Sequence, residues 1–282
     1  MVEYSERFLQ NEQVKILLTW NVNKRLMTRL ICVTSAKGGV GKTTVVANLA
    51  AALADFGQNT IAMDANLTTP NLGLHVGMHL APKTLHHVLN GKFALRSAIY
   101  SHPYGFKIIP ASIRLNELKN IDVGRLPEIT FSLLGKADYV LLDSAAGIGR
   151  EAISALSASD EVIVVTNPTF PAVTDALKIL KIAQSTNMKV TGVILNRIKN
   201  KEYELTGEQI EEILNVPIIA KIPEDPKIEE AIQQKKVIYE YSPNSPAAIE
   251  IKKLAAYLTG RNYQPPQMNV SFWDRVFGWL KG

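Results

Sequence analysis

The sequence predicts an α/β fold in which a mostly parallel, twisted sheet is covered by helices on both faces. Two observations favour this class. Short runs of Val, Ile and Leu alternate along the chain with longer segments of helical character, and these runs are apolar throughout. Strands of that kind are buried on both faces, and parallel neighbours need helical crossovers between them. Polar residues follow several of the runs, so we expect ligands at the carboxyl edge of the sheet.

The expected elements follow one another in a regular order. A first strand is predicted at residues 30–34 and a first helix at residues 42–55, where alanine and leucine favour helix and Gly57 follows as a stop signal. Thr206 and Gln209 have the spacing of a capping box. Further strands are predicted at residues 60–64, 106–110, 139–143, 161–166, 190–196 and 217–222, and further helices at 172–186, 206–214, 226–235 and 246–258.

Length and composition indicate one large globular domain. The chain has 282 residues, of which 46% are hydrophobic and 20% charged. Its net charge of +5 suits anionic lipid or nucleic acid without deciding between them. Cys32 is the single cysteine, which excludes a disulfide within the chain and predicts a reducing, cytoplasmic location. The sequence shows no apolar run of about 18 residues and no secretory signal, so we expect neither a spanning helix nor export.

A glycine-rich loop follows the first strand directly. Residues 37–44 have the sequence KGGVGKTT, in which the glycines allow a tight turn that directs backbone N–H groups at phosphate oxygens. Lys42 is expected to reach the β and γ phosphates, and the Thr43 hydroxyl to ligate Mg²⁺. The predicted nucleotide-binding residues of this loop are Gly38, Gly39, Val40, Gly41, Lys42, Thr43 and Thr44.

This loop departs from the usual P-loop pattern at two positions. Ala36 stands where the pattern has glycine, and Lys37 adds a second lysine. With these changes it resembles the deviant Walker A loop of the MinD/ParA family, in which the additional lysine crosses a dimer interface to touch the partner's nucleotide. Over residues 28–258, the resemblance implies the three-layer α/β/α fold of P-loop NTPases, ATP and Mg²⁺ as cofactors, an ATP-dependent homodimer, and catalytic roles for Lys37 and Lys42.

Acidic residues at strand ends complete the expected metal site. Asp143 ends the apolar strand at 139–143, which is the Walker B arrangement for orienting Mg²⁺, although an aspartate there is also a common turn residue. Residues 144–148 are similar to the switch II segment of the family. The resemblance also places Asn196 and Pro223 where relatives contact adenine. The predicted metal ligands are Thr43, Asp64 and Asp143.

Switch I differs from the family pattern. Relatives carry Asp-x-Asp after the second strand, whereas this chain has Asp64 followed by Ala65 and Asn66. In the family the second aspartate helps to position the attacking water. An asparagine can hold water by hydrogen bonds but cannot accept its proton at neutral pH. We therefore expect a slow ATPase in which Asn66 has a catalytic role, and the alternative is a scaffold that binds ATP without hydrolysing it.

The end of the chain predicts a separate module. Residues 270–282 place an apolar half against a polar half at helical spacing, and two tryptophans on the apolar half suit a membrane interface. The alternative is a helix docked on the core or on a partner. The expected segments are an extension at 1–27, within which Met27 is a candidate start, an ATPase domain at 28–260, a linker at 261–269 and this helix at 270–282. The predicted membrane contacts are Phe272, Trp273, Val276, Phe277, Trp279 and Leu280.

The C-terminal pattern favours the MinD branch of the family over the DNA-partitioning ParA branch. We expect an ATP-bound dimer that attaches reversibly to the anionic inner face of the cell membrane and helps to position the division site or another polar structure. We also expect a regulatory or cargo protein of unknown identity as a partner. DNA is the less favoured partner, since it would require a basic stripe on the folded dimer.

Overall fold

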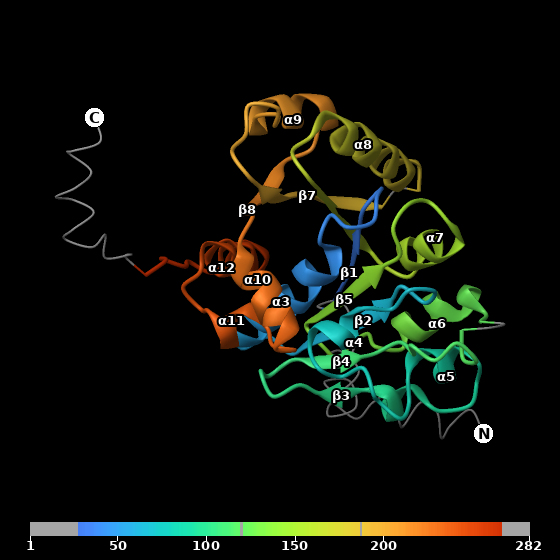
Figure 1. Cartoon of the computed structure of the whole chain (residues 1–282). Helices are drawn as coiled ribbons and strands as arrows, with labels where there is room; N and C mark the ends of the chain where they lie inside the picture. The colour runs from blue at the N-terminus through green and yellow to red at the C-terminus, as the bar shows by residue number, and fades with distance from the viewer. Residues whose placement is uncertain (1–27, 119–120, 187, 267–282) are drawn as a thin grey trace, which may run out of the picture.

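The computed structural model describes residues 28–118, 121–186 and 188–266 and is built on a central eight-stranded sheet (Figure 1). The strand order is β3-β4-β2-β5-β1-β6-β7-β8, and neighbouring strands are parallel except β3 and β4, which are antiparallel. The strands are β1 (Arg29–Thr34), β2 (Thr60–Ala65), β3 (Tyr100–Ser101), β4 (Lys107–Ile109), β5 (Tyr139–Ser144), β6 (Glu161–Thr166), β7 (Lys189–Ile198) and β8 (Ile218–Pro223).

Helices cover both faces of this sheet and enclose two apolar clusters, one on each side. On one side lie α3 (Lys42–Asp55), α4 (Leu72–His75), α10 (Pro226–Gln233), α11 (Ile238–Tyr241) and α12 (Pro246–Thr259). On the other lie α5 (Leu85–Leu89), α6 (Leu126–Phe131), α7 (Arg150–Ser157), α8 (Phe170–Ser185) and α9 (Gly207–Leu214).

The apolar character of the strands follows from these two layers. In β1, Ile31 and Val33 pack into one cluster while Leu30 and Cys32 pack into the other, because successive side chains of a strand point to opposite faces. Each fully buried aliphatic side chain contributes about 1.5–3 kcal/mol to stability. Burial also raises the pKa of the Cys32 thiol to about 12, so this cysteine acts as a core residue.

The predicted α/β class is confirmed, and the predicted strands are present with small shifts at their ends. The capping box at Thr206 is also confirmed: its hydroxyl accepts a hydrogen bond from the N–H of Gln209 at 3.3 Å. Two differences stand out. The long helix predicted at 172–186 begins at Phe170, and the short strand β3 at the sheet edge was not predicted, since two residues give no periodic signal.

The predicted segments at the two ends of the chain lie largely outside the described residues. This holds for the extension at 1–27 and for the amphipathic helix at 270–282. Of the predicted linker, residues 261–266 are coil, and the Tyr263 ring packs edge-on against Phe56 with ring centroids 6.2 Å apart. Among the helices that the structure describes, none is both long and apolar enough to cross a membrane.

Candidate functional site

The predicted phosphate loop connects β1 to α3 at the carboxyl edge of the sheet. Gly39 and Gly41 have φ angles of 80° and 95°, a region that other residues rarely adopt. The hydroxyl of Ser35 donates to the carbonyl of Lys37 at 2.7 Å and fixes the start of the turn. The first N–H groups of α3 have no partner within the helix, so they are available to an anion at this end.

Asn196 lies directly beneath this loop. Its side-chain amide donates to the carbonyl oxygen of Val40 at 2.7 Å, and a Cβ atom added to Gly41 would lie 2.2 Å from the same nitrogen. Glycine is therefore required at position 41 both by its φ and by the close approach of β7. The predicted contact of Asn196 with adenine stays a prediction, and the structure assigns this side chain a supporting role under the loop.

The two lysines of the loop are placed differently. Lys42 is buried beside the carboxylate of Asp143; burial lowers the pKa of its ammonium and the negative charge of Asp143 opposes that effect. Lys37 is 55% exposed, and its Nζ forms an ion pair with Asp175 of α8 at 2.7 Å. Lys178 and Lys37 together lower the pKa of Asp175 to about 2. One lysine thus faces its own site while the other points along the surface.

The aspartates predicted to bind metal meet at the carboxyl ends of adjacent strands. Asp64 of β2 and Asp143 of β5 are paired in parallel register, and both are fully buried. Asp64 accepts hydrogen bonds from the N–H groups of Leu72 at 3.0 Å and Asn66 at 3.3 Å. Among the described residues, neither carboxylate oxygen of Asp143 has a hydrogen-bond partner.

Two buried carboxylates in this position carry an electrostatic cost. Burial raises the pKa of Asp143 to about 6, although Thr43 and Lys42 oppose the shift in part, and burial together with the charge of Asp143 raises the pKa of Asp64. A divalent cation would relieve that cost, because oxygen ligands are those that Mg²⁺ prefers. These two carboxylates and the Thr43 hydroxyl therefore fit Mg²⁺, with water and phosphate oxygens completing its shell.

Asn66 lines the cavity over the loop, but its amide is engaged within switch I. Its Nδ2 donates to the carbonyl of Thr69 at 2.7 Å, and the Thr69 hydroxyl donates back to its Oδ1 at 3.1 Å. The side chain must therefore change partners before it can hold an attacking water. Its catalytic role stays a prediction.

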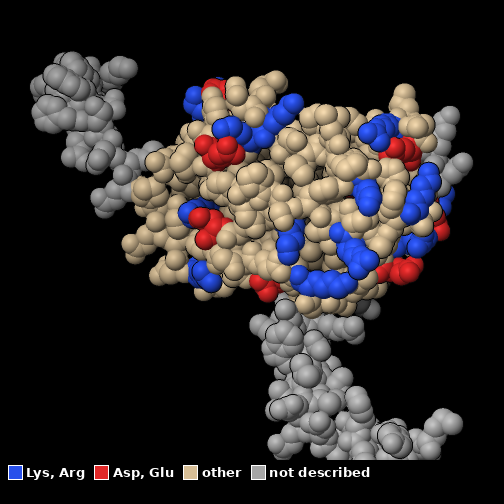
Figure 2. Space-filling model, turned by 90° about the horizontal axis from the view of Figure 1, so that it is seen from below, with Lys and Arg blue, Asp and Glu red and all other residues tan. Residues whose placement is uncertain are grey.

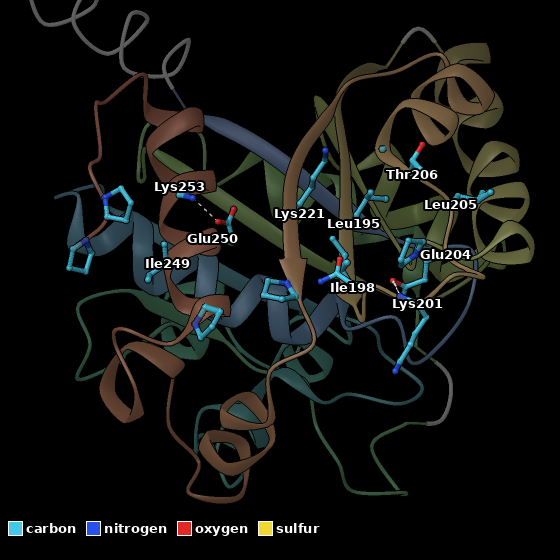
Figure 3. Close-up of a pocket in the computed structure, with 17 residues that line it drawn as sticks. Leu195, Ile198, Lys201, Glu204, Leu205, Thr206, Lys221, Ile249, Glu250 and Lys253 are labelled. Carbon is cyan, nitrogen blue, oxygen red and sulfur yellow. Dashed lines mark hydrogen bonds and ion pairs between the residues drawn. The ribbon is translucent and has the colours of Figure 1, made fainter. Parts of the chain in front are cut away.

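The cavity over the phosphate loop has a volume of about 460 Å³, which is suitable for a nucleotide. A larger groove of about 700 Å³ shares no lining residue with this cavity; there, residues from β7, β8 and α12 face one another (Figure 3). Asn196 and Pro223 line a small hollow at the carboxyl ends of β7 and β8. Thr44 and Val45, at the start of α3, also line it. The residues of the phosphate loop and Asn66 line the cavity of about 460 Å³, which is therefore the candidate site.

Eight lining residues of this cavity were not predicted as site residues, and among them His75 and Arg197 carry ionisable side chains next to the loop and to Asn196. The Nδ1 of His75 donates to the carbonyl of Asn71 at 2.9 Å, which leaves Nε2 unprotonated and 3.5 Å from the hydroxyl of Thr44. Burial lowers the pKa of this histidine, so the ring is neutral at pH 7. Arg197 follows Asn196 with a φ of 57°. The available signals were weak: His75 comes a few residues after switch I, and Arg197 directly follows the predicted site residue Asn196.

Comparisons with known proteins agree with this geometry. Residues 31–238 match the family described as the CobQ/CobB/MinD/ParA nucleotide binding domain. An uncharacterized ATP-binding protein of Methanocaldococcus jannaschii is 39% identical over 239 residues, which cover 85% of this chain and 90% of that protein.

Two solved structures are similar throughout. The septum site-determining protein MinD of Pyrococcus horikoshii, complexed with Mg-ADP, superimposes with a TM-score of 0.80 at 38% identity, covering 82% of this chain and 96% of that one. In the MinC:MinD cell division protein complex of Aquifex aeolicus, the matched chain has a TM-score of 0.76 at 29% identity, covering 86% and 100%. The chain is therefore a member of the MinD/ParA family of ATP-binding, magnesium-dependent P-loop ATPases.

Proposed function

We propose that this protein is a MinD-like ATPase whose ATP-bound dimer attaches reversibly to a membrane and positions division machinery or another polar structure. The observation that carries the proposal is the opposite placement of the two loop lysines. Lys42 is buried against its own metal site, whereas Lys37 is exposed and does not line its own cavity. By exchanging its exposed ion pair with Asp175 for a phosphate, a lysine so placed can reach the nucleotide of a second copy, as an arginine finger would.

Exposed apolar side chains near the same edge support an interface between two copies. Ile148, in the switch II segment, is 58% exposed, and Phe170, at the start of α8, is 61% exposed. Both follow strands that end beside the phosphate loop, β5 and β6. Because both side chains lie at the edge that also carries the exposed Lys37, this edge is suited to contacts with a second copy.

Different residues of the site have different roles in phosphoryl transfer. The amides of the loop and Lys42 hold the phosphates, and Thr43, Asp64 and Asp143 hold Mg²⁺, which neutralises phosphate charge when bound. Asn66 is the proposed water-positioning residue. Because an amide is no base, hydrolysis relies on positioning and charge stabilisation alone and is slow.

Attachment to the membrane depends on the C-terminal segment. Its charge is only +1, from Arg275 and Lys281 against Asp274, so insertion of apolar side chains has to supply most of the affinity. One short amphipathic helix binds marginally, while two on one dimer gain roughly 10²–10⁴ in avidity. The nucleotide state thereby controls membrane attachment.

Two other functions remain as rivals. A DNA-partitioning ATPase would need a continuous basic stripe; on the face that is seen from below, several Lys and Arg gather toward the lower right, with acidic residues at the margin of that group (Figure 2). A scaffold that binds ATP without turnover is the second rival, and the closed pair of Asn66 and Thr69 is the observation that favours it.

Sedimentation with anionic vesicles tests membrane attachment. The full chain and a chain lacking residues 270–282 are each incubated with ATP or ADP. We expect pelleting of the full chain with ATP only, while equal pelleting under all four conditions would contradict the proposal. Neutral vesicles show how much of the membrane binding depends on the negative charge of the lipid. A labelled DNA duplex in place of the vesicles tests the alternative of a DNA-partitioning ATPase.

A phosphate-release assay separates the enzyme from the scaffold. We expect slow turnover in the native chain, faster turnover in Asn66→Asp and slower turnover in Asn66→Ala. If Asn66→Ala leaves the rate unchanged, this side chain has no role. If the native chain releases no phosphate with or without vesicles, the scaffold is correct.

A further inference from the structure

A glutamate outside the predicted site clamps the backbone of switch I. One carboxylate oxygen of Glu151, in the first turn of α7, accepts hydrogen bonds from the N–H groups of Leu67 at 3.1 Å and Thr68 at 3.2 Å. Its other oxygen accepts a hydrogen bond from the Thr68 hydroxyl. Three donors therefore converge on one carboxylate from residues that follow Asn66 directly.

The same stretch of backbone is held from the opposite side. The carbonyl of Leu67 accepts a hydrogen bond from Nε2 of His86 at 3.0 Å, and Nδ1 of that ring accepts from the N–H of Ser112 at 3.0 Å. His86 is fully buried, and burial lowers the pKa of its ring, which keeps it neutral. Leu67, itself fully buried, is thus fixed at both its N–H and its carbonyl group by two different elements.

The helix that carries Glu151 begins where switch II ends. Residues 144–149 lead directly into α7, and within them the N–H of Gly147 donates to the carbonyl of Ser35 at 2.8 Å, at the start of the phosphate loop. A continuous path of hydrogen bonds and one helical turn therefore runs from the phosphate loop through switch II to switch I. The Glu151 carboxylate is therefore placed by the same segment that contacts the phosphate loop.

We propose that Glu151 is a positioning residue that ties switch I to switch II, so that the two segments respond to nucleotide together and place Asn66 at the γ-phosphate. The proposal rests on the proposed ATPase function. Glu151 does not line the cavity and has no contact with the reacting atoms. It acts through the backbone of Leu67 and Thr68, one and two residues beyond Asn66.

An acidic residue in the first turn of a helix also stabilises the helix dipole, and this simpler role needs a control. Glu208 provides it, because it occupies the same second position of α9 as Glu151 does of α7. It is exposed and is no part of the site. Glu208→Ala removes the dipole effect without touching either switch.

Three substitutions separate hydrogen bonding from charge. Glu151→Ala removes all three acceptor contacts. Glu151→Asp keeps the charge but withdraws the carboxylate by one methylene, and Glu151→Gln loses the charge but keeps a carbonyl oxygen for the two amides. We expect Glu151→Ala and Glu151→Asp to lower kcat about tenfold with KM for ATP unchanged within about twofold, and Glu151→Gln to recover most of the rate.

Thr68→Val removes the hydroxyl contact and completes a double-mutant cycle. We expect it to lower kcat about threefold in the native background and to have little further effect in Glu151→Ala, since both changes break the same contact. The Glu208→Ala control should keep native kcat and KM. A raised KM with unchanged kcat, or full activity of Glu151→Asp with loss in Glu151→Gln, would overturn the proposal.

Hydrogen exchange gives a readout that does not require turnover. With a non-hydrolysable ATP analogue, native protein should gain protection together in residues 66–69 and 145–149, whereas Glu151→Ala should gain it only in 145–149. Joint protection in Glu151→Ala would refute the coupling. If the native chain releases no phosphate, the ATPase proposal fails, and this exchange pattern alone still decides whether Glu151 couples the switches.

Discussion

Replacing Asp143 by asparagine should stabilise the nucleotide-free protein while abolishing its response to Mg-ATP. The side chain is fully buried beside Asp64, and both of its oxygens lack hydrogen-bond partners among the described residues. An amide of the same shape removes a buried charge that Thr43 and Lys42 offset only in part. The same change removes a carboxylate that fits Mg²⁺, so stability and ligand binding are expected to move in opposite directions.

The magnitude follows from the raised pKa of Asp143. A pKa of about 6, against the ordinary value of 3.8, corresponds to about 3 kcal/mol of destabilisation at pH 7 in the native chain. The folded state binds this proton more tightly than the unfolded state. The free energy of unfolding of the native chain therefore falls by this amount as the pH rises from about 4 to 6. For a domain of this size, 3 kcal/mol corresponds to an increase of about 6–12 °C in the Tm of Asp143→Asn at pH 7.

Thermal unfolding at several pH values, with and without Mg-ATP, measures both effects. Between pH 5 and 7 the free energy of unfolding of the native chain should fall by about 1 kcal/mol more than that of Asp143→Asn. Saturating Mg-ATP should raise the Tm of the native chain only. A lower Tm for ligand-free Asp143→Asn at pH 7 would refute the reasoning, because it would mean that the charged carboxylate stabilises the fold.

Three further predictions concern the loop, the cavity and the sheet. Gly41→Ala should destabilise the protein by about 2–3 kcal/mol and prevent nucleotide binding, since its Cβ would meet the asparagine beneath the loop; Gly38→Ala, with open space around its Cβ, should leave thermal stability unchanged. His75→Ala should weaken ATP binding about two- to tenfold by calorimetry, through loss of one polar contact in the cavity. Glu161→Gln should lower the free energy of unfolding by about 2 kcal/mol at pH 7. Burial raises the pKa of this carboxyl, but hydrogen bonds led by those of Arg29 outweigh that effect and set the pKa at about 2. In denaturant titrations, the difference in unfolding free energy between the native chain and Glu161→Gln should therefore shrink as the pH falls from about 4.5 to 2.

The sequence predicted the parts of the fold that depend on long periodic segments. The buried strands are apolar on both faces, and helices such as α3 and α12 combine composition with clear stop or cap residues. Several elements of two to eight residues escaped, among them β3 and the helices α4 to α7, because so few residues carry too little pattern to separate helix from loop. The eight-residue helices α9 and α10 were predicted because cap residues mark their starts.

The sequence by itself determined the phosphate loop, since its glycines, lysines and hydroxyls are consecutive residues whose chemistry requires only one turn between a strand and a helix. Strand ends and the family resemblance also pointed to Asp64, Asp143 and Asn196, but only the tertiary structure decided how these residues contact one another and that Glu151 joins them. The parallel register brings Asp64 beside Asp143, β7 brings Asn196 under the loop, and α7 brings Glu151 to switch I. These contacts span 79, 156 and 84 positions, separations at which spacing in the chain carries no information about proximity.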